Sequence, residues 1–184
     1  MYQYKVLFLD TVFSSYEVPT SRFTCTASSH ISVDETCKNL YSKQKLYATD
    51  IGGWITEGDG IGSWVKIEFH GNIQISKIVY RHNALKPNYC CNQNFKDVSF
   101  GFSDGTILNV TLPDVFDKDF SFKINPPKLS SYLYLNAVSV HYHPEQDNDE
   151  YSVVYYDNRY GIDKIRLFGS IEKGAPFRDI IKSS

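Results

Sequence analysis

Two histidines, His141 and His143, come closest in this chain to the spacing of a metal site. Alternate residues of a strand point to the same face, so the two imidazoles would lie side by side. Jelly-roll metalloenzymes combine such a pair with a carboxylate and a later histidine. Here Glu145 follows the pair too closely, and every other histidine precedes it. The pattern favours a surface strand end that runs into an acidic loop.

Two other candidates for chemistry are equally weak. Ser28, Ser29 and His30 are adjacent, but neither serine lies in a G-x-S-x-G turn that would expose a nucleophile. The glycines of residues 52–62 lack the preceding strand and following helix of a phosphate-binding loop. The sequence therefore predicts a protein that is not an enzyme.

Polar and aromatic residues gather instead on two long connections, residues 82–94 and 143–160. Long irregular loops in an otherwise regular β domain commonly carry function. Sugars are bound by an aromatic ring that stacks on them and by planar groups that bond their hydroxyls, and protein interfaces favour the same residue types. The predicted ligand-binding residues are Arg81, His82, Asn83, Tyr89, Asn92, Tyr156, Asn158 and Arg159.

Composition limits the class of protein. The chain has 184 residues, 42% of them hydrophobic, which fits one sizeable domain. Its 19 basic and 21 acidic residues are spread along the sequence, so no basic cluster predicts binding to nucleic acid. No apolar run is long enough to predict a transmembrane segment, and the N-terminal run that Asp10 closes is too short for a secretion signal.

We therefore expect an intracellular protein, either cytoplasmic or associated with the cytoskeleton or cilium. In that setting the four cysteines, Cys25, Cys37, Cys90 and Cys91, are predicted to be reduced thiols.

Alternation of apolar and polar residues predicts strands throughout. It occurs in residues 21–27, 64–69, 73–81, 120–124, 131–143 and 161–169, and the phase slips after Ser76 as a β-bulge would require. Residues 95–112 predict a hairpin that turns at 103–105. Short helical turns are predicted at 35–40 and, in the C-terminal tail, at 176–181. The fold class is all-β, an antiparallel jelly-roll β-sandwich.

Four segments carry a resemblance to a known family: AxDxGGW from Ala48, GxGSWVKIEF ending at Phe69, FKDVSFGFSDGT from Phe95, and GIDKIRLFGS at 161–170. Their order and spacing resemble the F5/8 type C, or discoidin, domains of the galactose-binding-like fold. Within that superfamily the chain is most similar to glycan-binding modules attached to bacterial NAD glycohydrolases. The resemblance covers residues 23–170 and implies a jelly roll of eight strands whose loops at one end hold a ligand.

The resemblance also implies a division of the chain and one metal. Residues 21–172 form the discoidin-like sandwich, residues 1–20 an extension or first strand, and residues 173–184 a tail. Asp50 falls where many relatives place a ligand of structural calcium, and capping of a turn is its alternative role. No other cofactor is predicted.

Two functions remain open from the sequence. As a non-catalytic binding module, the domain would recognise a glycan through these loops. As a scaffold, it would be a subunit of a larger intracellular assembly and hold protein partners through the same tyrosine-rich segments.

Overall fold

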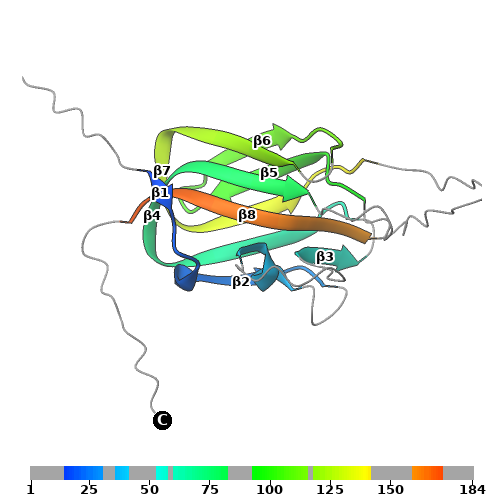
Figure 1. Ribbon diagram of the computed structural model, residues 1–184, viewed down its shortest axis with the longest axis horizontal. Helices are drawn as coiled ribbons and strands as arrows, with labels where there is room; N and C mark the ends of the chain where they lie inside the picture. Colours follow the sequence, from blue (N-terminus) through cyan, green and yellow to red (C-terminus); the bar gives the residue numbers. More distant parts are fainter. Residues whose placement is uncertain are drawn as a thin grey trace, which may run out of the picture.

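The computed structural model describes residues 15–30, 36–41, 53–57, 60–82, 93–115, 118–141 and 159–171. Eight strands and two short 3-10 helices lie in this part of the chain, and every strand pairs with its neighbours in antiparallel fashion (Figure 1). The strands are β1 (Tyr16–Glu17), β2 (Phe23–Ala27), β3 (Trp54–Glu57), β4 (Trp64–His82), β5 (Asp97–Phe102), β6 (Ile107–Thr111), β7 (Asp119–Ala137) and β8 (Arg159–Ile171). The 3-10 helices are η1 (Thr20–Arg22) and η2 (Cys37–Tyr41). The predicted all-β antiparallel sandwich is confirmed.

The strands β4 and β7 are each 19 residues long and take part in both layers of the sandwich. The first half of β4 pairs with β2 and the second half with β8, while β7 pairs with β4 along both halves. The register shifts between Glu68 and Ile73, where Gly71 has a φ of 95°. Such a positive φ suits glycine, so the strand can bend there and pass from one layer to the other. Alternation predicted two separate strands in each of these two segments, but β4 and β7 are each one continuous strand.

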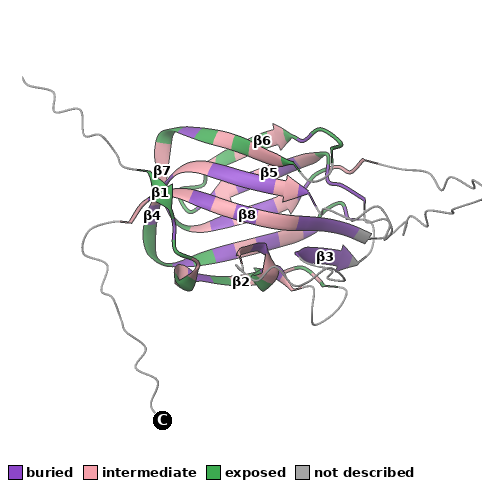
Figure 2. Ribbon diagram, in the orientation of Figure 1, coloured by how far each residue is buried: buried purple, intermediate pink, exposed green. Residues whose placement is uncertain are grey.

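The two layers enclose one core (Figure 2). Val65, Ile67 and Phe69, which alternation placed on one face, are all buried. Ile165 and Leu167 of β8 are buried as predicted. Rings from the two layers meet in the middle, as the centroids of Phe100 on β5 and Phe122 on β7 lie 6.0 Å apart.

Two local predictions are also confirmed. The register of β4 shifts between Ile75 and Lys77, which is the bulge that the phase slip after Ser76 required. Strands β5 and β6 form the predicted hairpin, and its turn holds Gly105 at a φ of 82°. The Thr106 amide donates to the Asp104 side chain there at 2.8 Å.

The prediction of reduced thiols is wrong for Cys25 and Cys37, which form a disulfide. Cys25 lies on β2 at the edge of a layer, and η2 packs beside it with Cys37 and Leu40 buried. Their Cα atoms are 6.1 Å apart, a separation that a disulfide spans. Disulfides persist chiefly in oxidising compartments, and the intracellular location of this protein stays a prediction.

Other predictions fall on segments that are not described, namely Cys90, Cys91 and the helical turn at 176–181. The helical turn predicted near 35–40 corresponds to η2. No helix among the described residues is long and apolar enough to cross a membrane.

Candidate ligand-binding site at the loop end

The two segments predicted to bind ligand are anchored at the same end of the sandwich (Figure 1). Strand β4 ends there at His82, and β8 begins there at Arg159. Strand β3 pairs with the first residues of β8, and Gln93 forms an isolated bridge with Tyr160. The fold therefore brings together chain ends that are far apart in the sequence.

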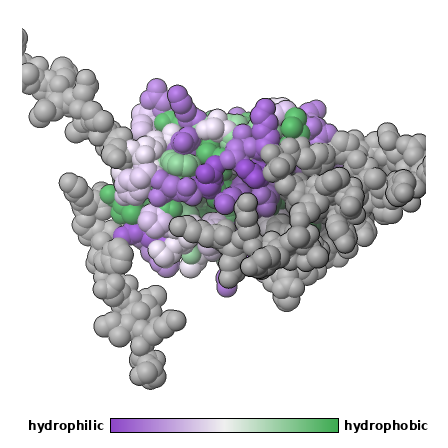
Figure 3. All heavy atoms as spheres, in the orientation of Figure 1, coloured by the Kyte–Doolittle hydropathy of each residue, from purple (hydrophilic) through white to green (hydrophobic). Residues whose placement is uncertain are grey.

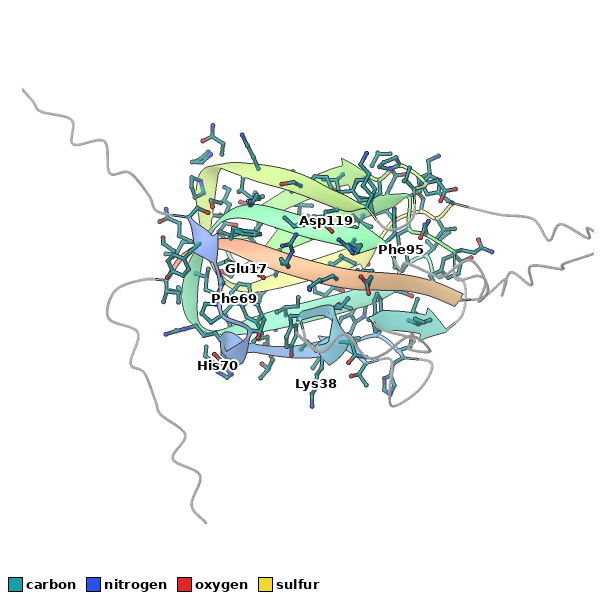
Figure 4. The ribbon with its side chains drawn as sticks, in the orientation of Figure 1. Glu17, Lys38, Phe69, His70, Phe95 and Asp119 are labelled. Carbon is teal, nitrogen blue, oxygen red and sulfur yellow. A yellow bond between two sulfur atoms is a disulfide. The ribbon has the colours of Figure 1, made fainter. Side chains whose placement is uncertain are left out.

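A stack of aromatic rings supports this end from below. Phe95 lies between Trp54, at 6.1 Å between ring centroids, and Tyr160, at 6.0 Å, and all three rings are nearly parallel (Phe95 is labelled in Figure 4). The Trp54 indole donates to the Ser29 carbonyl at 2.7 Å. Gly60 lies so close to Tyr160 that a Cβ atom would be 2.4 Å from the ring. These side chains form a closely packed layer beneath the loop end.

His82, a predicted ligand-binding residue, is completely buried. Its Nε2 donates to the Pro113 carbonyl at 3.1 Å, and the Tyr80 hydroxyl lies 3.4 Å from its Nδ1. Burial lowers the pKa of His82 to about 4, so the ring is neutral at pH 7. The imidazole fastens the end of β4 to the chain at Pro113 and presents no surface of its own to a ligand.

Arg81, the neighbour of His82, points to the outer face of its layer. Its Nε donates to Oδ1 of Asp119 at 2.6 Å, and Arg166 of β8 bonds the other oxygen of that carboxylate. Burial would raise the pKa of Asp119, but the hydrogen bonds and charges of the two arginines outweigh it and hold that pKa below its usual range. The structure thus separates Arg81 from His82, because consecutive residues of a strand face opposite ways.

The remaining predicted site residues are not placed by the structure. Arg159 is the first residue of β8 and pairs with Glu57 through the backbone, and its side chain is not described. Five others lie outside the described residues, namely Asn83, Tyr89, Asn92, Tyr156 and Asn158. Their grouping into one site remains a prediction.

Two of the residues considered as metal ligands are likewise not placed by the structure. Asp50 and His143 lie outside the described residues. His141 donates from Nε2 to the Leu112 carbonyl at 2.8 Å, which is a structural bond. Within the described ranges, no group of three or more His, Cys, Asp or Glu side chains could hold a metal ion.

Sequence reasoning missed two buried amides at this end, those of Gln93 and Asn94. Asn94 donates from Nδ2 to Asp114 at 2.9 Å, but its Oδ1 and both polar atoms of the Gln93 amide are buried without a hydrogen-bond partner. Buried polar atoms are nearly always bonded, so such atoms call for a role. Nothing in the sequence distinguishes these two residues from the other asparagines of the same segment.

No family model matches the sequence, and no curated protein matches it. Solved structures do match. The family 32 carbohydrate-binding module of NanJ from C. perfringens, solved in complex with galactose, has a TM-score of 0.59 at 10% identity and covers 84% of this chain and 98% of its own. An F5/8 type C domain from Bacteroides fragilis has a TM-score of 0.57 at 11% identity, covering 86% and 98%.

Discoidin II of Dictyostelium discoideum also matches, with a TM-score of 0.57 at 11% identity, over 86% of this chain and 60% of its own. The finer likeness to modules of NAD glycohydrolases stays a prediction. The order of strands, the two layers and these matches together show that the chain has the galactose-binding-like fold of discoidin, or F5/8 type C, domains.

Proposed function

We propose that this domain is a non-catalytic carbohydrate-binding module whose ligand is held at the loop end of the sandwich. The observation that carries the proposal is the match, over 84% of this chain, to a carbohydrate-binding module solved with galactose. At 10% identity that match gives the fold alone, so the ligand has to be argued from this chain's own residues.

The chemistry of the loop end supports a sugar ligand. The stack of Trp54, Phe95 and Tyr160 fixes the ends of the chain from which the predicted binding segments start. Those segments carry tyrosine, asparagine and arginine, which can stack on a sugar ring and bond pairs of hydroxyls. A preformed support lowers the conformational entropy that binding would otherwise cost.

The histidines at this end support the absence of catalysis. His82 and His141 both donate from Nε2 to backbone carbonyls, so neither is poised to accept a proton there from a substrate. With its pKa near 4 and no exposed surface, His82 is also a poor general acid at neutral pH.

A glycan array followed by calorimetry with the best ligand tests the proposal. We expect Arg159→Ala and Tyr156→Ala each to weaken glycan binding at least about tenfold, in keeping with the loss of a stacking ring or of a charged hydrogen bond. Arg22→Ala is the matched control, because Arg22 lies in η1 at the opposite end of the sandwich and bonds the His70 carbonyl.

Protein partners recovered in fixed stoichiometry, with no response to any glycan, would contradict this proposal. That outcome would support the scaffold function.

A further inference from the structure

Cations that are dispersed in the sequence gather on one outer face of the folded domain. This face, formed by the first half of β7, the second half of β4 and β8, carries Lys77, Arg81, Lys123, Lys164 and Arg166. Figure 3 looks onto the side of the molecule where β8 lies in front and shows hydrophilic side chains across its middle. The chain as a whole has a net charge of −2, so the clustering arises from folding alone.

The strand register places like charges directly opposite each other. Lys77 of β4 faces Lys123 of β7, and Arg81 of β4 faces Lys164 of β8. Like charges in such cross-strand pairs destabilise a sheet, so these pairs do not serve the stability of the fold.

Among the described residues, acidic side chains pair with the arginines of this face but not with its lysines. Asp119 bonds both Arg81 and Arg166, and Glu17 of β1 lies 4.0 Å from Arg166 (Asp119 and Glu17 are labelled in Figure 4). Asp163 precedes Lys164 on β8 and has an interaction of its own.

The three lysines, by contrast, form no ion pair with any described residue. The ammonium of Lys77 lies 3.7 Å from the centre of the Phe168 ring, and Lys123 is exposed. Three cationic groups on neighbouring strands are therefore available to an anionic ligand.

We propose that this lysine face binds the sulfate and carboxylate groups of a linear anionic polysaccharide. Strands lie about 4.8 Å apart and alternate residues about 6.8 Å apart, so Lys77, Lys123 and Lys164 form a flat array rather than a closed pocket. A flat array of separate cations matches a chain of repeated anionic groups, which an extended polymer can lay across three strands.

Two other polyanions fit the face less well. Single-stranded nucleic acid gains much of its affinity from bases that stack on exposed rings, and here Lys77 and Arg166 both lie over the Phe168 ring. Membrane surfaces are commonly bound by cations together with inserted apolar side chains, and Val79, in the middle of the face, is buried.

The inference is independent of the loop end, because the three lysines lie on the outer side of the strands. The test uses the full chain with heparin as the anionic polysaccharide, dextran as the neutral one, a single-stranded oligonucleotide, and vesicles that contain phosphatidylserine. We expect heparin to bind, dextran not to bind, and the logarithm of the affinity for heparin to fall linearly with the logarithm of salt concentration, as counterion release requires.

The triple variant Lys77→Gln, Lys123→Gln, Lys164→Gln should lose about tenfold or more of the affinity for heparin and show a shallower salt dependence. Its matched control removes the same charge elsewhere through Lys38→Gln, Lys66→Gln and Lys96→Gln and should keep the wild-type affinity. The first variant removes two repulsive pairs and also the contact of Lys77 with the Phe168 ring, so its melting temperature is measured beside the affinity to identify misfolding as a cause.

Equal losses in the two triple variants would overturn the proposal, because net charge alone would then explain them. So would an absence of heparin binding, or binding of only the oligonucleotide or the vesicles. Glycan binding at the loop end should be unchanged in both variants, so failure of this proposal is distinguishable from failure of the carbohydrate-binding function.

Discussion

His82 donates from Nε2 to the backbone carbonyl of Pro113 across 3.1 Å, inside the domain and directly beneath the loop end. The bond joins the end of β4 to the segment that follows β6. The imidazole of His82 is fully removed from water, so the protonation state of this ring is linked to the stability of the fold.

The pKa of His82 in the folded domain is about 4, against 6.5 for the free side chain, chiefly because of burial. The unfolded chain therefore takes up a proton at a higher pH than the folded domain does. Stability that is complete above pH 6.5 should be lost as the pH falls toward 4, by as much as about 3 kcal/mol. Urea unfolding at pH 7.0 and 4.5 measures this loss.

The variant His82→Phe isolates the contribution of this ring. It removes the titrating group and keeps an aromatic ring against Phe120, so its loss of stability between pH 7.0 and 4.5 should be smaller than that of the wild type. His70→Gln, at an exposed position, should retain the full wild-type dependence. An identical pH dependence in His82→Phe would contradict the assignment.

Asp119 holds two arginines from different strands, Arg81 and Arg166. Asp119→Asn should lower the free energy of unfolding by about 1–2 kcal/mol, because it removes the charged carboxylate that both partly buried guanidinium groups bond. The expected loss of stability is modest because all three side chains are about one third exposed, at 31–33%, and water screens their charges.

Glu68→Gln is the matched control for Asp119. It removes the more exposed carboxylate that pairs with Lys66 and should change the stability by less than about 0.5 kcal/mol. Equal effects of the two substitutions in chemical denaturation would contradict a special role for Asp119.

Most of the sandwich could be predicted from the sequence because local patterns determine it. Alternation placed Val65, Ile67 and Phe69 inward, and the phase slip at Ser76 located a bulge that the register of β4 confirms. Gly105 likewise marked its turn. The continuity of β4 and β7 was not predictable, because it depends on pairing with partners distant in the chain.

Long-range contacts also explain why several features could not be predicted from the sequence. In the sequence His82 resembles a loop residue, but the pairing of β4 with β8 carries it into the core. The disulfide between Cys25 and Cys37 depends on how η2 packs beside β2, which spacing alone does not reveal. The lysine face could not be predicted, because basic and acidic residues are evenly mixed along the sequence.

Removal of the disulfide through Cys25→Ser and Cys37→Ser should lower the free energy of unfolding by about 2–3 kcal/mol. The two cysteines are separated by 12 positions, and closing a loop of that size restricts the unfolded chain by roughly this amount. Thermal melts with and without dithiothreitol measure the effect. The reductant should lower the melting temperature of the wild type and leave that of the double variant unchanged, and a wild-type protein insensitive to reductant would contradict the prediction.

Gln93→Met tests the buried amide at the loop end. The amide of Gln93 is fully buried with both polar atoms unpaired, a state that costs about 1–3 kcal/mol, whereas methionine fills a similar volume without polar atoms. The substitution should therefore raise the free energy of unfolding, by about 1 kcal/mol. Gln74→Met, on the outer side of β4, is the control and should not change this free energy. A fall in the stability of Gln93→Met would contradict the prediction, because it would mean that the amide is bonded in the folded protein.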